Sequence, residues 1–217
     1  RVCDNERLYP IRPCSMKMTF PMILTLLRIA LIPVLVVFFY LPYHWAPLAT
    51  AAVFILAAIT DWLDGYLARR MGLMSAFGAF LDPVADKLMV ATALVLMVQI
   101  PPPILAPKIL FTLSAAIIIG REIAISALRE WMSEMGESGT VKVGLLGKFE
   151  TIFQMTAISC LLYEYNLFGL PMALIGEMLL YLAAALTLWS MWEYLHAAWP
   201  VMSRPDNDVS EDVAEEE

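Results

Sequence analysis

The chain has 217 residues, of which 60% are hydrophobic and 16% are charged, and its mean hydropathy is +0.71. This composition excludes an ordinary soluble domain and indicates a polytopic membrane protein. The formal net charge is -7, but the last segment, RPDNDVSEDVAEEE, holds seven acids and one arginine and leaves a net charge of -1 for the rest of the chain. Because the body of the chain has no basic surface, nucleic acid is not expected as a partner.

Six long apolar segments follow one another along the chain, separated by short polar or proline-rich connections. A helix that spans a bilayer needs about 20 apolar residues. The recurrence of such segments disfavours the alternative, a soluble protein with long core helices. The predicted fold class is all-α, a polytopic integral membrane protein with six transmembrane helices, at residues 20–42, 46–65, 78–100, 103–133, 147–165 and 171–197.

This pattern divides the chain into three regions. Residues 20–199 are predicted to form the six-helix membrane domain, and residues 1–19 a cytoplasmic N-terminal segment. Residues 200–217 are predicted to form an acidic, disordered cytoplasmic tail, because the segment is highly charged and has few apolar residues. Residues 1–15 precede the first methionines and are interpreted as a non-native remnant or an upstream extension, so no functional residue is sought among them.

Lysine and arginine are concentrated on one side of the predicted helices. The cytoplasmic loops of membrane proteins carry an excess of these residues, and the opposite side of this chain holds only Lys108. Both chain ends, and the connection after the second helix, are therefore predicted to be cytoplasmic. The cations on that side are Arg1, Arg7, Arg12, Lys17, Arg69, Arg70, Arg129, Lys142 and Arg204.

Four aspartates lie where the second predicted helix ends and the third begins, in TDWLDGYLARRMGLMSAFGAFLDPVADKLMVA. Asp61 and Asp64 are three residues apart, and Asp82 and Asp86 are four apart, so each pair shares one face of its helix. The short connection is expected to fold the helices into an antiparallel pair and bring the four carboxylates together at the cytoplasmic surface. Adjacent carboxylates repel one another unless cations compensate, and oxygen ligands select hard cations. The pattern predicts two Mg2+ or Mn2+ ions that clamp a phosphoryl group.

Glycine and arginine residues among the aspartates favour a ligand that carries phosphate. Gly65 and Gly78 have no side chain and allow the backbone to approach a ligand closely. Arg69 can bind a phosphate through two parallel hydrogen bonds. Each of these residues alone is more often structural, at a helix end or a membrane interface. Their combination with the aspartates indicates a nucleotide or phosphate ligand.

The whole stretch resembles a known family. It fits D-x-x-D-G-x-x-A-R, then eight residues, then G-x-x-x-D-x-x-x-D, the signature of the CDP-alcohol phosphotransferases. All eight positions match, at Asp61, Asp64, Gly65, Ala68, Arg69, Gly78, Asp82 and Asp86. The resemblance implies the CDP-alcohol phosphotransferase fold, a homodimer, and an enzyme that transfers a substituted phosphate from a CDP-linked donor to an alcohol and releases CMP.

The resemblance also implies a role for each matched residue. The metal ligands would be Asp61, Asp64, Asp82 and Asp86. Asp86 would also be the catalytic general base, since it lies one helical turn beyond Asp82, toward the acceptor. The residues that bind the donor would be Asp61, Asp64, Gly65, Ala68, Arg69, Gly78 and Asp82.

Further segments are similar to one branch of the family, the phosphatidylglycerophosphate synthases of Gram-negative bacteria. These segments are LTLLRIALIPVLVVFFYLP, REIAISALREWM and AALTLWSMW. They imply an enzyme of phospholipid biosynthesis in the bacterial inner membrane, surrounded by membrane lipids, with CDP-diacylglycerol and sn-glycerol 3-phosphate as substrates. Two alternatives stay open. One is another acceptor alcohol, inositol phosphate or serine; the other is a divalent-cation transporter that uses the aspartates as a permeation site.

An acceptor that carries a phosphate needs cations beside it. Charged residues within apolar segments are functional candidates, so Arg28, Arg121 and Lys148 are predicted to bind the acceptor phosphate, assisted by Lys142 from the glycine-rich loop. Similar enzymes often have a second lysine two residues after Lys148, where this chain has Glu150. Glu122 is expected to pair with a neighbouring cation, and Lys87 to be structural.

Overall fold

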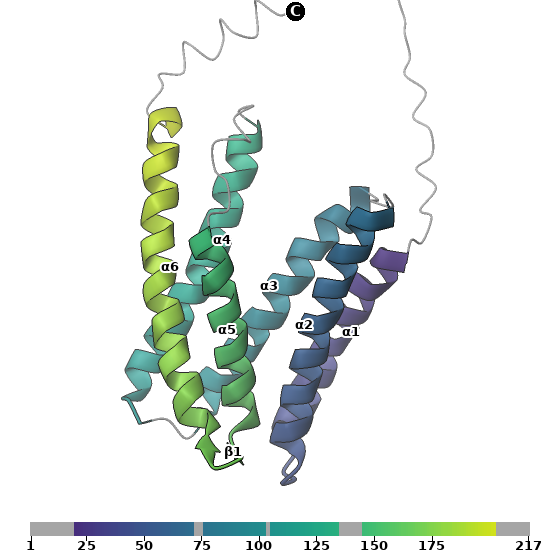
Figure 1. Ribbon diagram of the computed structural model, residues 1–217, viewed down its shortest axis with the longest axis vertical. Helices are drawn as coiled ribbons and strands as arrows, with labels where there is room; N and C mark the ends of the chain where they lie inside the picture. The colour runs from purple at the N-terminus through teal and green to yellow at the C-terminus, as the bar shows by residue number, and fades with distance from the viewer. Residues whose placement is uncertain (1–19, 72–75, 103–104, 135–144, 203–217) are drawn as a thin grey trace, which may run out of the picture.

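The computed structural model describes residues 20–71, 76–102, 105–134 and 145–202. Within these ranges it gives no side-chain description for residues 20–21, 62, 64–71, 76–80, 82–83, 134, 145–146, 148 and 200–202. The described chain is almost entirely helical (Figure 1). Its helices are α1 (Phe20–Tyr40), α2 (Ala46–Met71), α3 (Ala76–Gln99), α4 (Lys108–Glu134), α5 (Leu145–Tyr163) and α6 (Met172–Met202).

The six predicted helices are confirmed, and their ends differ by a few residues from the expected ones. α2 continues to Met71 instead of ending near residue 65, because Ala68, Arg69 and Arg70 are good helix formers beyond the apolar stretch. α4 begins at Lys108 instead of residue 103. Prolines at 101–103 and at 107 explain this later start, since proline is tolerated before or in the first turn of a helix but not in its interior.

The helices form two groups that are joined by α3 and by direct contact between α2 and α5 (Figure 1). α1 packs against α2 on one side of the bundle, and α4 and α5 both pack against α6 on the other. α3 runs obliquely between the groups and contacts α1, α4 and α5. As a result, the carboxyl end of α2 and the amino end of α3 lie at the same end of the bundle as the amino end of α1.

One apolar core runs through the bundle and takes residues from all six helices. Phe54 of α2, Leu94 of α3, Ile118 of α4, Ile158 of α5 and Leu180 of α6 are all fully buried in it. Small residues such as alanine fill much of the remaining core, which lets the helix backbones approach one another closely as membrane helices do. The core therefore fixes the relative positions of the helix ends that carry the aspartates.

A tight hairpin joins α5 to α6. The strands β1 (Asn166–Leu167) and β2 (Leu170–Pro171) pair antiparallel, and only Phe168 and Gly169 lie between them. Both of these residues have positive φ angles, 51° and 82°, as a two-residue type I′ turn requires. The hairpin was not predicted, because the usual sequence signal for this turn is Asn-Gly or Asp-Gly.

Three helices of the described chain are long and apolar enough to cross a membrane, at Met22–Tyr40, Lys108–Ser133 and Met172–Trp199. α2 contributes a shorter apolar stretch, Ala46–Asp61. Many large apolar side chains on the helices are exposed, among them Val37, Leu113 and Trp192. Such a surface is typical of a protein whose surroundings are lipid.

Candidate active site

Asp61 lies on the last turns of α2 and is joined to the first helix by an ion pair. Oδ1 of Asp61 is 2.6 Å from Nη1 of Arg28, which is on α1. The Arg28 side chain is 1% exposed, whereas that of Asp61 is 37% exposed. A buried arginine thus holds a carboxylate that is itself partly exposed.

Asp86 lies on α3, and its side chain is half-buried. The next residue, Lys87, donates a hydrogen bond from Nζ to Oγ of Ser126 on α4. Ser126 in turn donates to the backbone oxygen of Glu122 at 2.7 Å. The expectation of a structural role for Lys87 fits this contact, because it connects the aspartate-bearing helix to α4.

The other residues of the signature lie outside the described side chains. They are Asp64, Gly65, Ala68, Arg69, Gly78 and Asp82, together with Lys148 from the predicted acceptor site, while Lys142 lies outside the described residues altogether. Among the side chains that the structure describes, no three of His, Cys, Asp or Glu form a metal-binding group. Only Asp61 and Asp86 of the four aspartates are in that set, so the predicted four-carboxylate site stays a prediction.

Arg121 is the centre of a buried polar network between α4, α5 and α6. Its Nη1 donates to Oε1 of Glu122 at 2.8 Å, as expected for Glu122. Its Nη2 donates to Oε2 of Glu150 and, at 3.0 Å, to Oγ of Ser190. Glu150 also accepts hydrogen bonds from Thr187 at 2.6 Å and from Ser190 at 2.9 Å. The guanidinium predicted to bind the acceptor phosphate is therefore in contact with two carboxylates.

Sequence reasoning did not identify Thr187 and Ser190 as members of this network. Both side chains are buried, at 0% and 2% exposure, in an apolar stretch of α6. They lie three residues apart in AALTLWSMW and so share one face of α6. That spacing of two hydroxyl groups in an apolar segment was the signal that could have revealed them.

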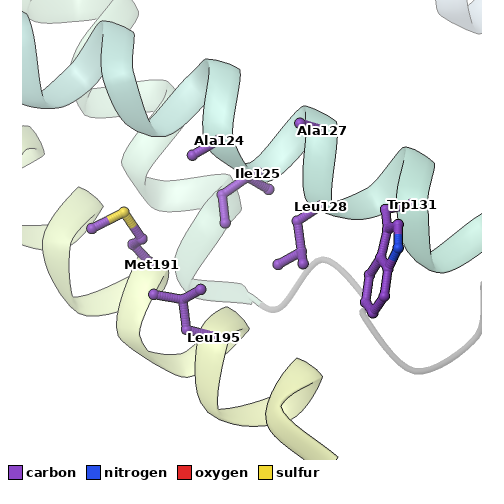
Figure 2. A pocket seen from close by; sticks show the side chains of 7 residues that line it. All are labelled: Ala124, Ile125, Ala127, Leu128, Trp131, Met191 and Leu195. Atoms are coloured by element: carbon purple, nitrogen blue, oxygen red, sulfur yellow. The ribbon is translucent and has the colours of Figure 1, made fainter. Parts of the chain in front are cut away.

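A groove of about 440 Å³ lies between α4 and α6, toward their carboxyl ends (Figure 2). In Figure 2 the side chains of Leu128 and Trp131 on α4 face the same space as Leu195 on α6. None of the described side chains that line it is charged or nucleophilic, and neither Asp61 nor Asp86 is among them. Its lining residues are Ala124, Ile125, Ala127, Leu128, Trp131, Met191 and Leu195.

Comparison with known proteins identifies close relatives. Three curated bacterial proteins bear the name CDP-diacylglycerol–glycerol-3-phosphate 3-phosphatidyltransferase. The protein from Salmonella choleraesuis is 50% identical over 183 residues, covering 84% of this chain and 96% of the relative. The one from Pectobacterium atrosepticum is 51% identical over 185 residues, with the same coverage. The one from Yersinia pestis is 48% identical over 192 residues, covering 88% of this chain and all of the relative.

A solved structure shows the same fold. The apo form of phosphatidylinositol phosphate synthase from Mycobacterium tuberculosis superposes with a TM-score of 0.61, at 20% identity, over 84% of this chain and 90% of the other. The family model for CDP-alcohol phosphatidyltransferases matches residues 18–189, which include α1 to α5, the first part of α6 and the eight signature residues. The chain belongs to the CDP-alcohol phosphatidyltransferase family.

Proposed function

We propose that this protein transfers the phosphatidyl group of CDP-diacylglycerol to sn-glycerol 3-phosphate, giving phosphatidylglycerophosphate and CMP. The proposal is carried by sequence identity. Relatives that bear the name of this activity have the same residue as this chain at about half of the aligned positions, over most of the chain. The complete eight-residue signature supports the reaction class, and the segments around Arg121 and Ser190 support the choice of acceptor.

The reaction needs one bond made and one broken at the same phosphorus atom. The 1-hydroxyl oxygen of the acceptor attacks the phosphorus that carries diacylglycerol, and the bond from that phosphorus to the CMP oxygen breaks. Asp86 is proposed to take the hydroxyl proton, as a carboxylate general base. No nucleophilic serine or cysteine is required, because direct in-line attack accounts for the products.

The family generally depends on a divalent cation, and the aspartates have the right chemistry to hold one. Asp61 is partly exposed, and carboxylate oxygens are the ligands that Mg2+ and Mn2+ prefer. Asp61, Asp64, Asp82 and Asp86 are proposed to hold two such ions. When bound, the ions would neutralise the diphosphate of the donor and orient it for attack.

The acceptor phosphate is proposed to bind among Arg28, Arg121, Lys142 and Lys148. Arg28 and Arg121 already contact carboxylates, Asp61 in one case and Glu122 and Glu150 in the other. An acceptor phosphate at either arginine would therefore compete with a carboxylate that is already present. This competition makes acceptor binding sensitive to the charges within the bundle.

The setting of the reaction follows from the charge distribution and the family. The protein is a membrane protein, and we propose the bacterial inner membrane as its location, with both ends of the chain and the active site on the cytoplasmic side. The excess of lysine and arginine on that side supports this orientation. A homodimer is proposed from the family resemblance.

The experiment that tests the proposed function separates an enzyme from a cation transporter. Purified protein in liposomes is given CDP-diacylglycerol, glycerol 3-phosphate and Mg2+, and release of CMP is measured with and without a chelator. We expect CMP release that requires the acceptor and stops when the metal is removed. Movement of Mg2+ across the liposome membrane with CDP-diacylglycerol left intact would instead identify a transporter.

A further inference from the structure

The buried network around Arg121 holds more negative than positive charge. One guanidinium contacts two carboxylates, that of Glu122 at 2.8 Å and that of Glu150, so the three side chains together carry a formal charge of -1. Glu122 is 27% exposed, but Glu150 is 1% exposed and Arg121 only 10%. Little solvent reaches the Arg121–Glu150 pair, and its charges are therefore weakly screened.

Glu150 is held firmly in this position. Its Oε1 accepts a hydrogen bond from Thr187, and its Oε2 accepts from Ser190 as well as from Arg121. Three donors around one carboxylate fix its position. The carboxylate is thereby held at Nη2 of Arg121, the same kind of position that an oxygen of a phosphate would take.

We propose that Glu150 is a specificity-determining residue, whose carboxylate competes with the acceptor phosphate for Arg121 and so lowers the affinity for a phosphorylated acceptor. This inference rests on the proposed function, in which the acceptor carries a phosphate near Arg121. Coulomb repulsion from the excess carboxylate acts on a dianionic acceptor and hardly at all on a neutral one. The residue at position 150 thus affects the choice between phosphorylated and unphosphorylated acceptors. The affinity for the donor should not depend on it, because the donor diphosphate is proposed to bind at the aspartates.

The test is the substitution Glu150→Gln, which keeps the size of the side chain and one of its two acceptor oxygens and removes its charge. The KM for glycerol 3-phosphate is expected to fall by roughly five- to tenfold, as for the loss of one charged competitor at a buried site. The KM for CDP-diacylglycerol should not change. In a thermal-shift titration, glycerol 3-phosphate should also stabilise the variant at lower concentrations than it stabilises the wild type.

A matched control is Glu177→Gln. Glu177 is also a buried glutamate, 2% exposed, but it accepts hydrogen bonds from the backbone N–H groups of Leu105 and Ala106 and from the hydroxyl group of Tyr181. This variant should leave the KM for glycerol 3-phosphate unchanged. A purely structural role for Glu150 would lower the melting temperature of Glu150→Gln without changing either KM.

If Glu150→Gln does not fold, the KM for glycerol 3-phosphate is measured for Glu122→Gln instead. This substitution removes the charge of the other, partly exposed carboxylate that contacts the guanidinium of Arg121. A smaller fall in the KM for glycerol 3-phosphate is expected. An unchanged or higher KM in the variant that folds would overturn the inference. Failure of the proposed function would look different, because the wild-type protein would then release no CMP in response to glycerol 3-phosphate.

Discussion

Charged side chains inside apolar helices are the residues to which the proposed chemistry is assigned. Asp61, Arg28 and Arg121 could be identified as functional candidates from the sequence, because ionisable groups are energetically costly in a membrane and usually serve a function there. The partners of these residues could not be predicted, because they come from different helices. Arg28 meets Asp61 across α1 and α2, and the order of helices along the chain does not fix which side chains will meet.

Asp86→Asn tests the proposed general base. Asparagine keeps the size of the side chain but cannot accept a proton, so turnover should fall by about 10² to 10⁴-fold. Binding of CDP-diacylglycerol, measured by a thermal-shift titration, should remain close to that of the wild type. Turnover near the wild-type rate in a variant that still binds the donor would assign the base to another residue.

Asp61→Asn is expected to affect both activity and stability. Loss of a metal ligand should abolish turnover, and Arg28, 1% exposed, loses the carboxylate at 2.6 Å. The free energy of unfolding should fall by about 1 to 3 kcal/mol, as for loss of a hydrogen bond to a charged group. Glu193→Gln is the control, since Glu193 is an exposed acid that accepts a hydrogen bond from Trp189 one turn away. Normal turnover of Asp61→Asn with Mg2+ would refute the metal assignment.

Helices were predicted well from the apolar segments, whereas the way they pack was not. The number of apolar segments that are long enough to span a membrane predicts the number of helices, because a chain in a membrane must satisfy its backbone hydrogen bonds internally. The observed helix ends differ from the predicted ones in two ways. Helix-forming polar residues extend α2 at its carboxyl end, and prolines move the start of α4 to a later residue. The Phe168–Gly169 turn was missed because phenylalanine rarely adopts a positive φ angle.

Close packing of α5 against α6 depends on Gly176. A Cβ atom there would lie 2.8 Å from Cγ of Leu161 and 2.9 Å from the backbone oxygen of Ala157. Gly176→Ala should therefore lower the free energy of unfolding by about 1 to 3 kcal/mol, the usual cost of overpacking. The measurement is a melting curve in detergent.

Gly120→Ala is the matched control for this prediction. Gly120 is also in a helix, α4, but a Cβ atom there would have nothing within 4 Å. Because alanine has the higher helix propensity, Gly120→Ala should be neutral or slightly stabilising. Equal melting temperatures for the two variants would contradict the close packing of α5 and α6.

At the scale of the whole molecule, the bundle brings the end of α2 and the start of α3 to the same end as the start of α1. The reaction class could be predicted from one stretch of about 30 residues, because every residue of the signature lies in it. The choice of acceptor could not be predicted from that stretch alone. In the proposed function it involves Arg121 of α4 and the buried Glu150 of α5, and the fold brings both together with Ser190 of α6.

The most direct test of the central claim is a competition between acceptors. Purified protein with CDP-diacylglycerol and Mg2+ receives glycerol 3-phosphate, inositol phosphate and serine in equal concentrations, and the lipid products are separated by mass spectrometry. Phosphatidylglycerophosphate should be the main product, formed in the same amount as the CMP released. A product that contains inositol phosphate or serine would contradict the assigned acceptor and leave the reaction class intact, whereas no lipid product at all would contradict the enzymatic function itself.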